Sequence, residues 1–113
     1  MTKVRVMYWK EIPVQVEATD GDKKISKPLG DRFQQGVDAI SMFDGSSTTD
    51  EYLDAWQWAH YCDMEGSADT VVKKVADMFN EGFPADFISR IRDLHLSETR
   101  NPIPGAVDHW ITG

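Results

Sequence analysis

The sequence has a single cysteine, Cys62, and no long run of apolar residues. One cysteine excludes an intrachain disulfide, so we expect a protein of a reducing compartment, by default the cytoplasm. The apolar runs fall far short of the ~20 residues of a membrane-spanning helix. The first thirty residues also lack the apolar segment of a signal peptide. We therefore expect a cytoplasmic protein with no membrane association.

Basic residues are absent from residues 33 to 72, a segment that carries eight acidic residues. The whole chain has a formal net charge of −7. A protein of this charge repels a phosphate backbone unless its basic groups are segregated. We therefore expect no nucleic-acid partner, while a basic protein partner or plain solubility remains open.

The chain has 113 residues, of which 41% are hydrophobic, as is typical of one soluble domain. Apolar and polar residues alternate from Lys3 to Trp9 and again from Ile12 to Ala18, which predicts two strands. Pro13 belongs at a strand start or edge because it cannot donate a ladder hydrogen bond. Asp20-Gly21 predicts a tight hairpin turn, followed by a lysine-rich edge strand over 23–27.

Two segments have helical periodicity, residues 31–43 and 68–81. The first is expected to begin with Asp31 as its N-cap, and the second with Ser67. Gly82 predicts a left-handed C-cap for the second helix. The apolar faces are formed by Phe33, Val37 and Ile40 in the first helix and by Val71, Val72, Val75, Met78 and Phe79 in the second.

Residues 50 to 63 are ambiguous. With a period of two, one face carries Tyr52, Trp56, Trp58, His60 and Cys62, whereas a helix would place Leu53, Trp56 and His60 together. We favour a strand over residues 55–62 because the segment is rich in aromatic residues and poor in strong helix formers. A short helical turn could precede it.

A third helix is predicted from Pro84 to Leu96. Residues 98–113 contain two prolines and two glycines, which argues against a regular element. This segment nevertheless ends in Val107, Trp110 and Ile111, which are costly to expose. We therefore predict one domain over residues 1–97 and a C-terminal tail over 98–113 that packs back on it or docks on a partner.

These elements predict an α+β fold with two layers. A three- to four-stranded, mostly antiparallel sheet is formed by residues 3–27 and 55–62, and the helices at 31–43 and 68–81 cover it. The third helix and the irregular tail wrap the edge.

Three strings of residues point to a known family: Tyr8-Trp9-Lys10-Glu11-Ile12-Pro13-Val14-Gln15-Val16, Arg32-Phe33-Gln34, and Tyr52-Leu53 followed by Trp56. They resemble the bacterial "virulence factor" domain, as in conserved virulence factor C, over about residues 4 to 83. The resemblance implies a compact α+β domain of largely unassigned function. It also implies stand-alone copies encoded near folate-linked and corrinoid-linked methyl-transfer genes. It carries over no catalytic residues.

His60, Cys62 and Asp63 are the candidate metal ligands, since an imidazole and a thiol two residues apart on a strand can share one ion. A structural zinc needs four ligands, however, and a catalytic zinc three. A thiol enzyme would in turn need a third group that orients His60 beside Cys62. Packing with a polar rim is the simpler interpretation, and we expect no metal and no cofactor.

Four tryptophans and three tyrosines are many for this length. Such side chains fill cores and also dominate protein interfaces. We predict a partner-binding surface that includes Trp9, Trp56, Trp58, Trp110 and Ile111.

The favoured function is a non-catalytic accessory or subunit protein that binds a larger cytoplasmic enzyme. The resemblance suggests folate- or corrinoid-linked one-carbon metabolism as its setting. One alternative is a small metal- or thiol-dependent enzyme centred on His60 and Cys62. The other is a small-molecule binding module, with Trp9, Trp56 and Trp58 around a flat cofactor such as a folate.

Overall fold

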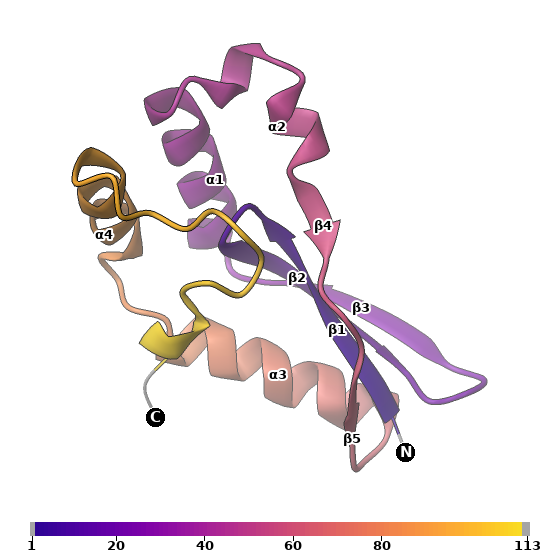
Figure 1. The fold of residues 1–113 in the computed structure, drawn as a ribbon. Helices are drawn as coiled ribbons and strands as arrows, with labels where there is room; N and C mark the ends of the chain where they lie inside the picture. Colours follow the sequence, from indigo (N-terminus) through magenta and orange to yellow (C-terminus); the bar gives the residue numbers. More distant parts are fainter. Residues whose placement is uncertain (1, 112–113) are drawn as a thin grey trace.

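A computed structural model describes residues 2–111 and shows the predicted α+β fold. The antiparallel sheet has the strand order β3-β2-β1-β4, and β5 pairs with β1 further along the same edge. Helix α3 lies along one face of the sheet, and α1 packs against α4 (Figure 1). The elements are β1 (Thr2–Trp9), β2 (Ile12–Thr19), β3 (Lys24–Pro28), α1 (Asp31–Phe43), η1 (Ser46–Thr48), α2 (Glu51–Asp54), β4 (Trp56–Trp58), β5 (Cys62–Met64), α3 (Ala68–Gly82), α4 (Phe87–Leu96) and η2 (Asp108–Trp110).

The first three strands follow the sequence pattern closely. Pro13 is the second residue of β2 and lies opposite Tyr8 of β1. Pairing between β2 and β3 begins only at Gln15, so the N–H that Pro13 lacks is not needed for a hydrogen bond to β3. The turn between β2 and β3 is centred one residue later than predicted. Asp20 N donates to Lys23 O at 3.0 Å, which places Gly21, with its φ of 92°, and Asp22 in the turn.

The single strand predicted over residues 55–62 is wrong in detail. Strand β4 pairs with β1 from Trp58 opposite Met7, and β5 pairs with it from Cys62 opposite Val4. Between these two pairs, the segment that joins β4 to β5 has three residues, 59–61, whereas β1 has two, Arg5 and Val6. The extra residue forms a bulge that interrupts the pairing with β1. The helical turn considered for the preceding residues is present as α2.

Two predicted helix caps differ from the structure. Gly30, not Asp31, is the N-cap of α1, and its N–H donates to the Asn80 side chain at 2.8 Å. Gly82 is the last residue of α3, and Phe83 is an extended C-cap, so no left-handed cap forms. Arg32 replaces that cap by donating to the carbonyls of Asn80 and Phe83 at 2.8 and 2.9 Å. Ser67 caps α3 as predicted.

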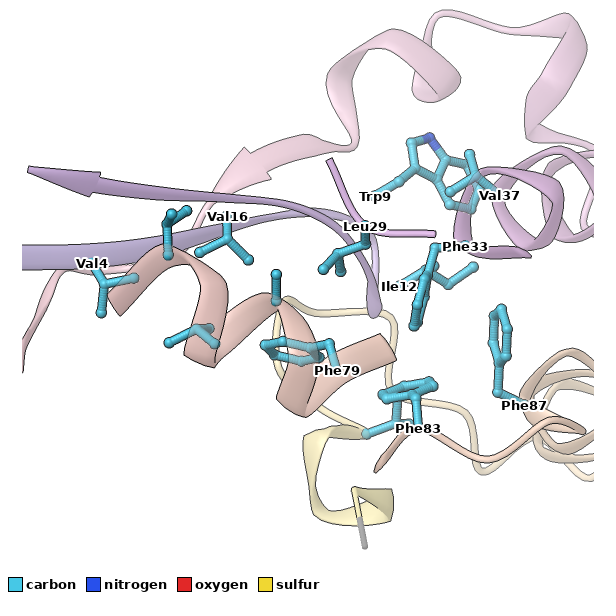
Figure 2. Close-up of a cluster of buried hydrophobic side chains, with 14 of the residues drawn as sticks. Val4, Trp9, Ile12, Val16, Leu29, Phe33, Val37, Phe79, Phe83 and Phe87 are labelled. Carbon is cyan, nitrogen blue, oxygen red and sulfur yellow. The ribbon is translucent and has the colours of Figure 1, made fainter. Parts of the chain in front are cut away.

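The core joins the sheet to α3 at one end and to α1 and α4 at the other (Figure 2). Val4 and Val16 lie near α3, whereas Trp9 lies with Val37 of α1. Between them, the rings of Phe33, Phe83 and Phe87 contact one another at centroid distances of 5.4 to 5.5 Å. Met78, predicted to share the apolar face of α3, is instead 47% exposed.

The third helix begins at Phe87, three residues later than predicted, because residues 84–86 form the connection after α3. The tail then crosses the molecule, and η2 lies beside the C-terminal end of α3 (Figure 1). Val107 is buried, and the ring of Trp110 lies 6.3 Å from that of Phe83. Thr112 and Gly113 of the predicted tail lie outside the described residues. Within residues 2–111, no helix has both the length and the apolar character needed to cross a membrane.

Gly36 sets the distance between α1 and α4. A Cβ at this position would lie 2.6 Å from two ring carbons of Phe87. We expect Gly36→Ala to lower the free energy of unfolding by about 1–3 kcal/mol, as overpacking of a core does. Urea denaturation measures this change. The exposed neighbour on α1 is the control, and Gln35→Ala should stay within about 0.5 kcal/mol of the wild type. Equal stability of the two variants would contradict this account.

Candidate functional site

The turn between β1 and β2 presents two charged residues. Trp9 pairs with Ile12, so Lys10 and Glu11 form the whole turn. Lys10 has a φ of 51°, a conformation uncommon for a residue other than glycine. Its N–H donates to Ala55 O at 3.2 Å, which joins the turn to the residue that follows α2. The turn is thereby fixed against a segment more than forty residues away in the sequence.

Glu11 is fully buried, and Arg100 from the tail neutralises it. Nε of Arg100 lies 2.7 Å from Oε2 and Nη2 lies 2.8 Å from Oε1, a bidentate pair. The Arg100 side chain is itself only 6% exposed. Two charges removed from water in this way need each other, since either one alone would be strongly destabilising.

Asp44, the C-cap of α1, completes the network. Its Oδ2 accepts from Lys10 Nζ at 2.8 Å and from Arg100 Nη1 at 3.0 Å, and its Oδ1 accepts from the N–H and the hydroxyl of Ser46. Burial acts to raise the pKa of this carboxyl, but the hydrogen bonds from Lys10, Ser46 and Arg100 outweigh burial and lower the pKa to about 2. Asp44 is therefore ionised at neutral pH and cannot serve as a general acid.

A cleft opens above this network, and we call it the charged cleft. It has a volume of about 480 Å³ and is lined by Lys10, Asp44, Glu51, His95, Glu98, Arg100 and Pro102. A smaller hollow of about 240 Å³ shares three of these residues and adds Asp54, Ala55 and Gln57. Glu51 is exposed, with only a 3.4 Å contact to Lys10. The exposed mouth of the cleft therefore presents the carboxylate of Glu51. In the buried floor, the charges of Lys10, Asp44 and Arg100 are paired with one another.

Five exposed apolar side chains belong to the segments that contribute residues to the charged cleft or the hollow, and we call them the apolar rim. Leu53, Leu96, Met42 and Ile103 are each more than half exposed, and Phe43 is 38% exposed. Each is close in sequence to a residue that lines the cleft or the hollow. The ring of Phe43 also contacts that of His95 at 5.3 Å, which joins the end of α1 to the end of α4. Grouped exposed apolar side chains are typical of interaction sites.

The predicted partner-binding tryptophans lie elsewhere. Trp9 is fully buried and its Nε1 donates to Tyr52 O at 3.0 Å, so it belongs to the core and cannot meet a partner. Trp56, Trp58 and Trp110 are half-buried. Trp58 lies 4.2 Å from the guanidinium of Arg5, and Trp110 and Ile111 pack against the core. Among the described residues, no tryptophan lines the charged cleft or the hollow beside it.

The predicted metal ligands are not assembled into one set. His60 and Cys62 both line a small apolar pocket beside β1, whereas Asp63 pairs with Lys3 at 3.2 Å. Cys62 and Asp63 are consecutive strand residues and so point to opposite faces of the sheet. Across the described residues, no three histidine, cysteine, aspartate or glutamate side chains are placed to hold a metal ion.

His60 also lacks the support that a thiol enzyme would need. In the described part of the chain, no hydrogen bond or ion pair involves its imidazole ring. A catalytic base beside a cysteine is normally oriented by a third group. The geometry around Cys62 therefore does not match that of an activated nucleophile.

Sequence reasoning missed Lys10, Glu11, Asp44 and Arg100 as a unit. Lys10 and Glu11 belong to the string that carries the family resemblance, but Arg100 is 89 residues from Glu11. No sequence signal marked Glu11 as buried, because it lies beside Lys10 in a turn, where charged residues are normally exposed.

The fold and the site define a small α+β domain with an internally neutralised polar cleft. The chain belongs to the virulence factor family, whose sequence model matches residues 7–91. The match extends beyond residue 83, where the resemblance was placed, and includes the first half of α4. Arg100 and the rest of the tail lie outside it. No curated protein and no solved structure matches the chain.

Loss of Arg100 should be costly. Arg100→Ala leaves the buried Glu11 without a counter-charge, so we expect the free energy of unfolding to fall by about 3–5 kcal/mol in urea denaturation. Arg90 provides the matched control, because its ion pair with Asp86 is exposed on α4. Arg90→Ala should cost less than about 1 kcal/mol. A similar loss in both variants would rule out the anchoring role.

The low pKa of Asp44 sets a pH dependence. A folded-state pKa of about 2, below the ordinary value of 3.8, gives stability that is present above pH 4 and lost as the pH falls from about 4 to 2. The stability difference between the wild type and Asp44→Asn should therefore be largest near neutral pH and shrink over this window. Thermal unfolding at several pH values measures it, and a difference that is constant with pH would contradict the assignment.

Proposed function

We propose that this chain is a non-catalytic accessory or subunit protein that binds a larger cytoplasmic enzyme through the charged cleft and its apolar rim. The observation that supports this most directly is the rim itself. Leu53, Leu96 and Met42 are each about 70% exposed, and they belong to three helices, α2, α4 and α1, whose residues or C-cap line the cleft or the hollow. An apolar side chain of this exposure on each of three such helices is typical of an interaction site.

The charges at the cleft favour a basic partner segment. Glu51, Asp54 and Glu98 line the cleft or the hollow and have no close cation besides the 3.4 Å contact of Glu51 with Lys10, among the described residues. An apolar rim around carboxylates is complementary to a lysine- or arginine-bearing segment with apolar neighbours. Such an interface should weaken as the salt concentration rises.

The pairing of the floor residues argues against catalysis at the cleft. Lys10, Glu11, Asp44 and Arg100 neutralise one another, so none of them is free to transfer a proton or attack a substrate. Ion pairs of this kind hold a surface in shape. The cleft is therefore better suited to binding than to chemistry.

The partner class follows from the family resemblance. Folate- and corrinoid-linked methyl-transfer enzymes are the first candidates, because stand-alone copies of the domain are expected near genes of that kind. The choice of a methyl-transfer enzyme is independent of the proposed docking surface, because the same surface could bind another large enzyme.

The test is an affinity pull-down of the tagged protein from the cytosol of the cells that produce it, with the stoichiometry measured by light scattering. We expect one large enzyme in a fixed ratio. The double variant Leu53→Ser, Leu96→Ser should lose it, because both side chains belong to the apolar rim.

The control variant is Met78→Ser, an exposed apolar residue on α3 away from the cleft, which should retain the enzyme. Circular dichroism checks that both variants fold. A solitary monomer in the eluate, or equal retention by the rim variant, would overturn the proposal.

A further inference from the structure

A second pocket lies between the tail and the sheet, and we call it the tail pocket. Its volume is about 320 Å³. Val4 and Val6 of β1, Val75 and Phe79 of α3, and Gly105 and Asp108 of the tail are among the residues that line it. This volume is at the lower end of the ~300–1,000 Å³ range of pockets that bind small molecules. Unlike the charged cleft, it is mainly apolar.

One carboxylate interrupts this apolar lining. Oδ2 of Asp108 accepts a hydrogen bond of 2.5 Å from the hydroxyl of Tyr8, but Oδ1 is buried and has no hydrogen-bond partner. Buried polar atoms are normally paired, and each exception calls for an explanation. Among residues 2–111, no lysine or arginine forms an ion pair with Asp108. Asp108 therefore carries an unused acceptor, and the residue is among those that line an apolar cavity.

The surroundings of this pair are poor in water. Burial is the main cause that raises the pKa of Asp108, and burial also raises the pKa of Tyr8. A cation placed beside Oδ1 would stabilise the ionised carboxylate more strongly here than in water. An anion would be repelled, and a hydrocarbon would leave Oδ1 unpaired.

We propose that the tail pocket binds a small organic amine. The apolar body of the ligand lies between β1 and α3, and its ammonium group donates a hydrogen bond to Oδ1 of Asp108. Tyr8 positions the carboxylate by holding Oδ2. The tail pocket shares no residue with the charged cleft or the apolar rim, so this proposal can be tested independently of the proposed docking function.

Cys62 provides a specific reporter of occupancy. It also lines the tail pocket, it is accessible, and it is the only cysteine in the sequence. A ligand in the pocket should therefore slow the alkylation of Cys62 by iodoacetamide, which mass spectrometry follows directly.

The experiment compares three probes with similar bodies: phenethylamine, phenethyl alcohol and phenylacetate. We expect phenethylamine to slow alkylation in a saturable way, phenethyl alcohol to do so more weakly, and phenylacetate to have no effect. Equal protection by phenethylamine and phenylacetate, or no protection by phenethylamine, would overturn the proposal. This comparison uses only the wild-type protein, so a folding defect in a variant cannot affect its result.

Asp108→Asn tests the role of the carboxylate. The amide oxygen can still accept from Tyr8, while the amide N–H₂ replaces the unpaired acceptor Oδ1, so phenethylamine should bind about tenfold more weakly or worse. Asp86→Asn, an exposed aspartate at the start of α4, is the control and should bind like the wild type. Retention of full affinity by Asp108→Asn would contradict the assignment.

Discussion

The buried pair between Glu11 and Arg100 is the interaction on which the arrangement of the molecule depends. Glu11 lies in the turn of the first hairpin, Arg100 follows α4, and Asp44 at the end of α1 accepts from the same guanidinium. Three segments that are far apart in the sequence thus meet at one cation. Arg100 and Asp44 also line the charged cleft, so the shape of the cleft depends on this contact. Since an isolated charge at this depth is strongly unfavourable, the network defines a single alignment of hairpin, helix and tail.

Those parts of the fold that depend on local patterns could be predicted from the sequence. Phe33, Val37 and Ile40 recur at the helical period and all are buried, and Ser67 caps α3 as its position indicates. The interruption between β4 and β5 was not predictable in this way. It arises because the segment that joins them has one residue more than the part of β1 that it faces. The end of α3 is a similar case. Arg32 satisfies its carbonyls from another helix, so the glycine cap suggested by Gly82 was unnecessary.

The candidate site was less accessible to sequence reasoning, and for a physical reason. Aromatic residues near one another suggested a surface, but Trp9 is fully buried because the hairpin places it beside α1. The cleft residues carry ordinary charges, and their spacing has no recognisable period. Only the pairing of β1 with β2 and the return of the tail bring Lys10, Asp44 and Arg100 together. Long-range topology, rather than any motif, creates the site.

The separation of 89 residues between Glu11 and Arg100 also affects how the protein folds during its synthesis on the ribosome. Synthesis runs from the N-terminus, and local elements can form as soon as they are made. The first hairpin is therefore available early, with a glutamate whose counter-charge has yet to be synthesised. Native burial of that glutamate has to wait until residue 100 has left the ribosome. Until then the hairpin turn stays in contact with water, so the domain can close only after α4 and the segment that carries Arg100 have been made.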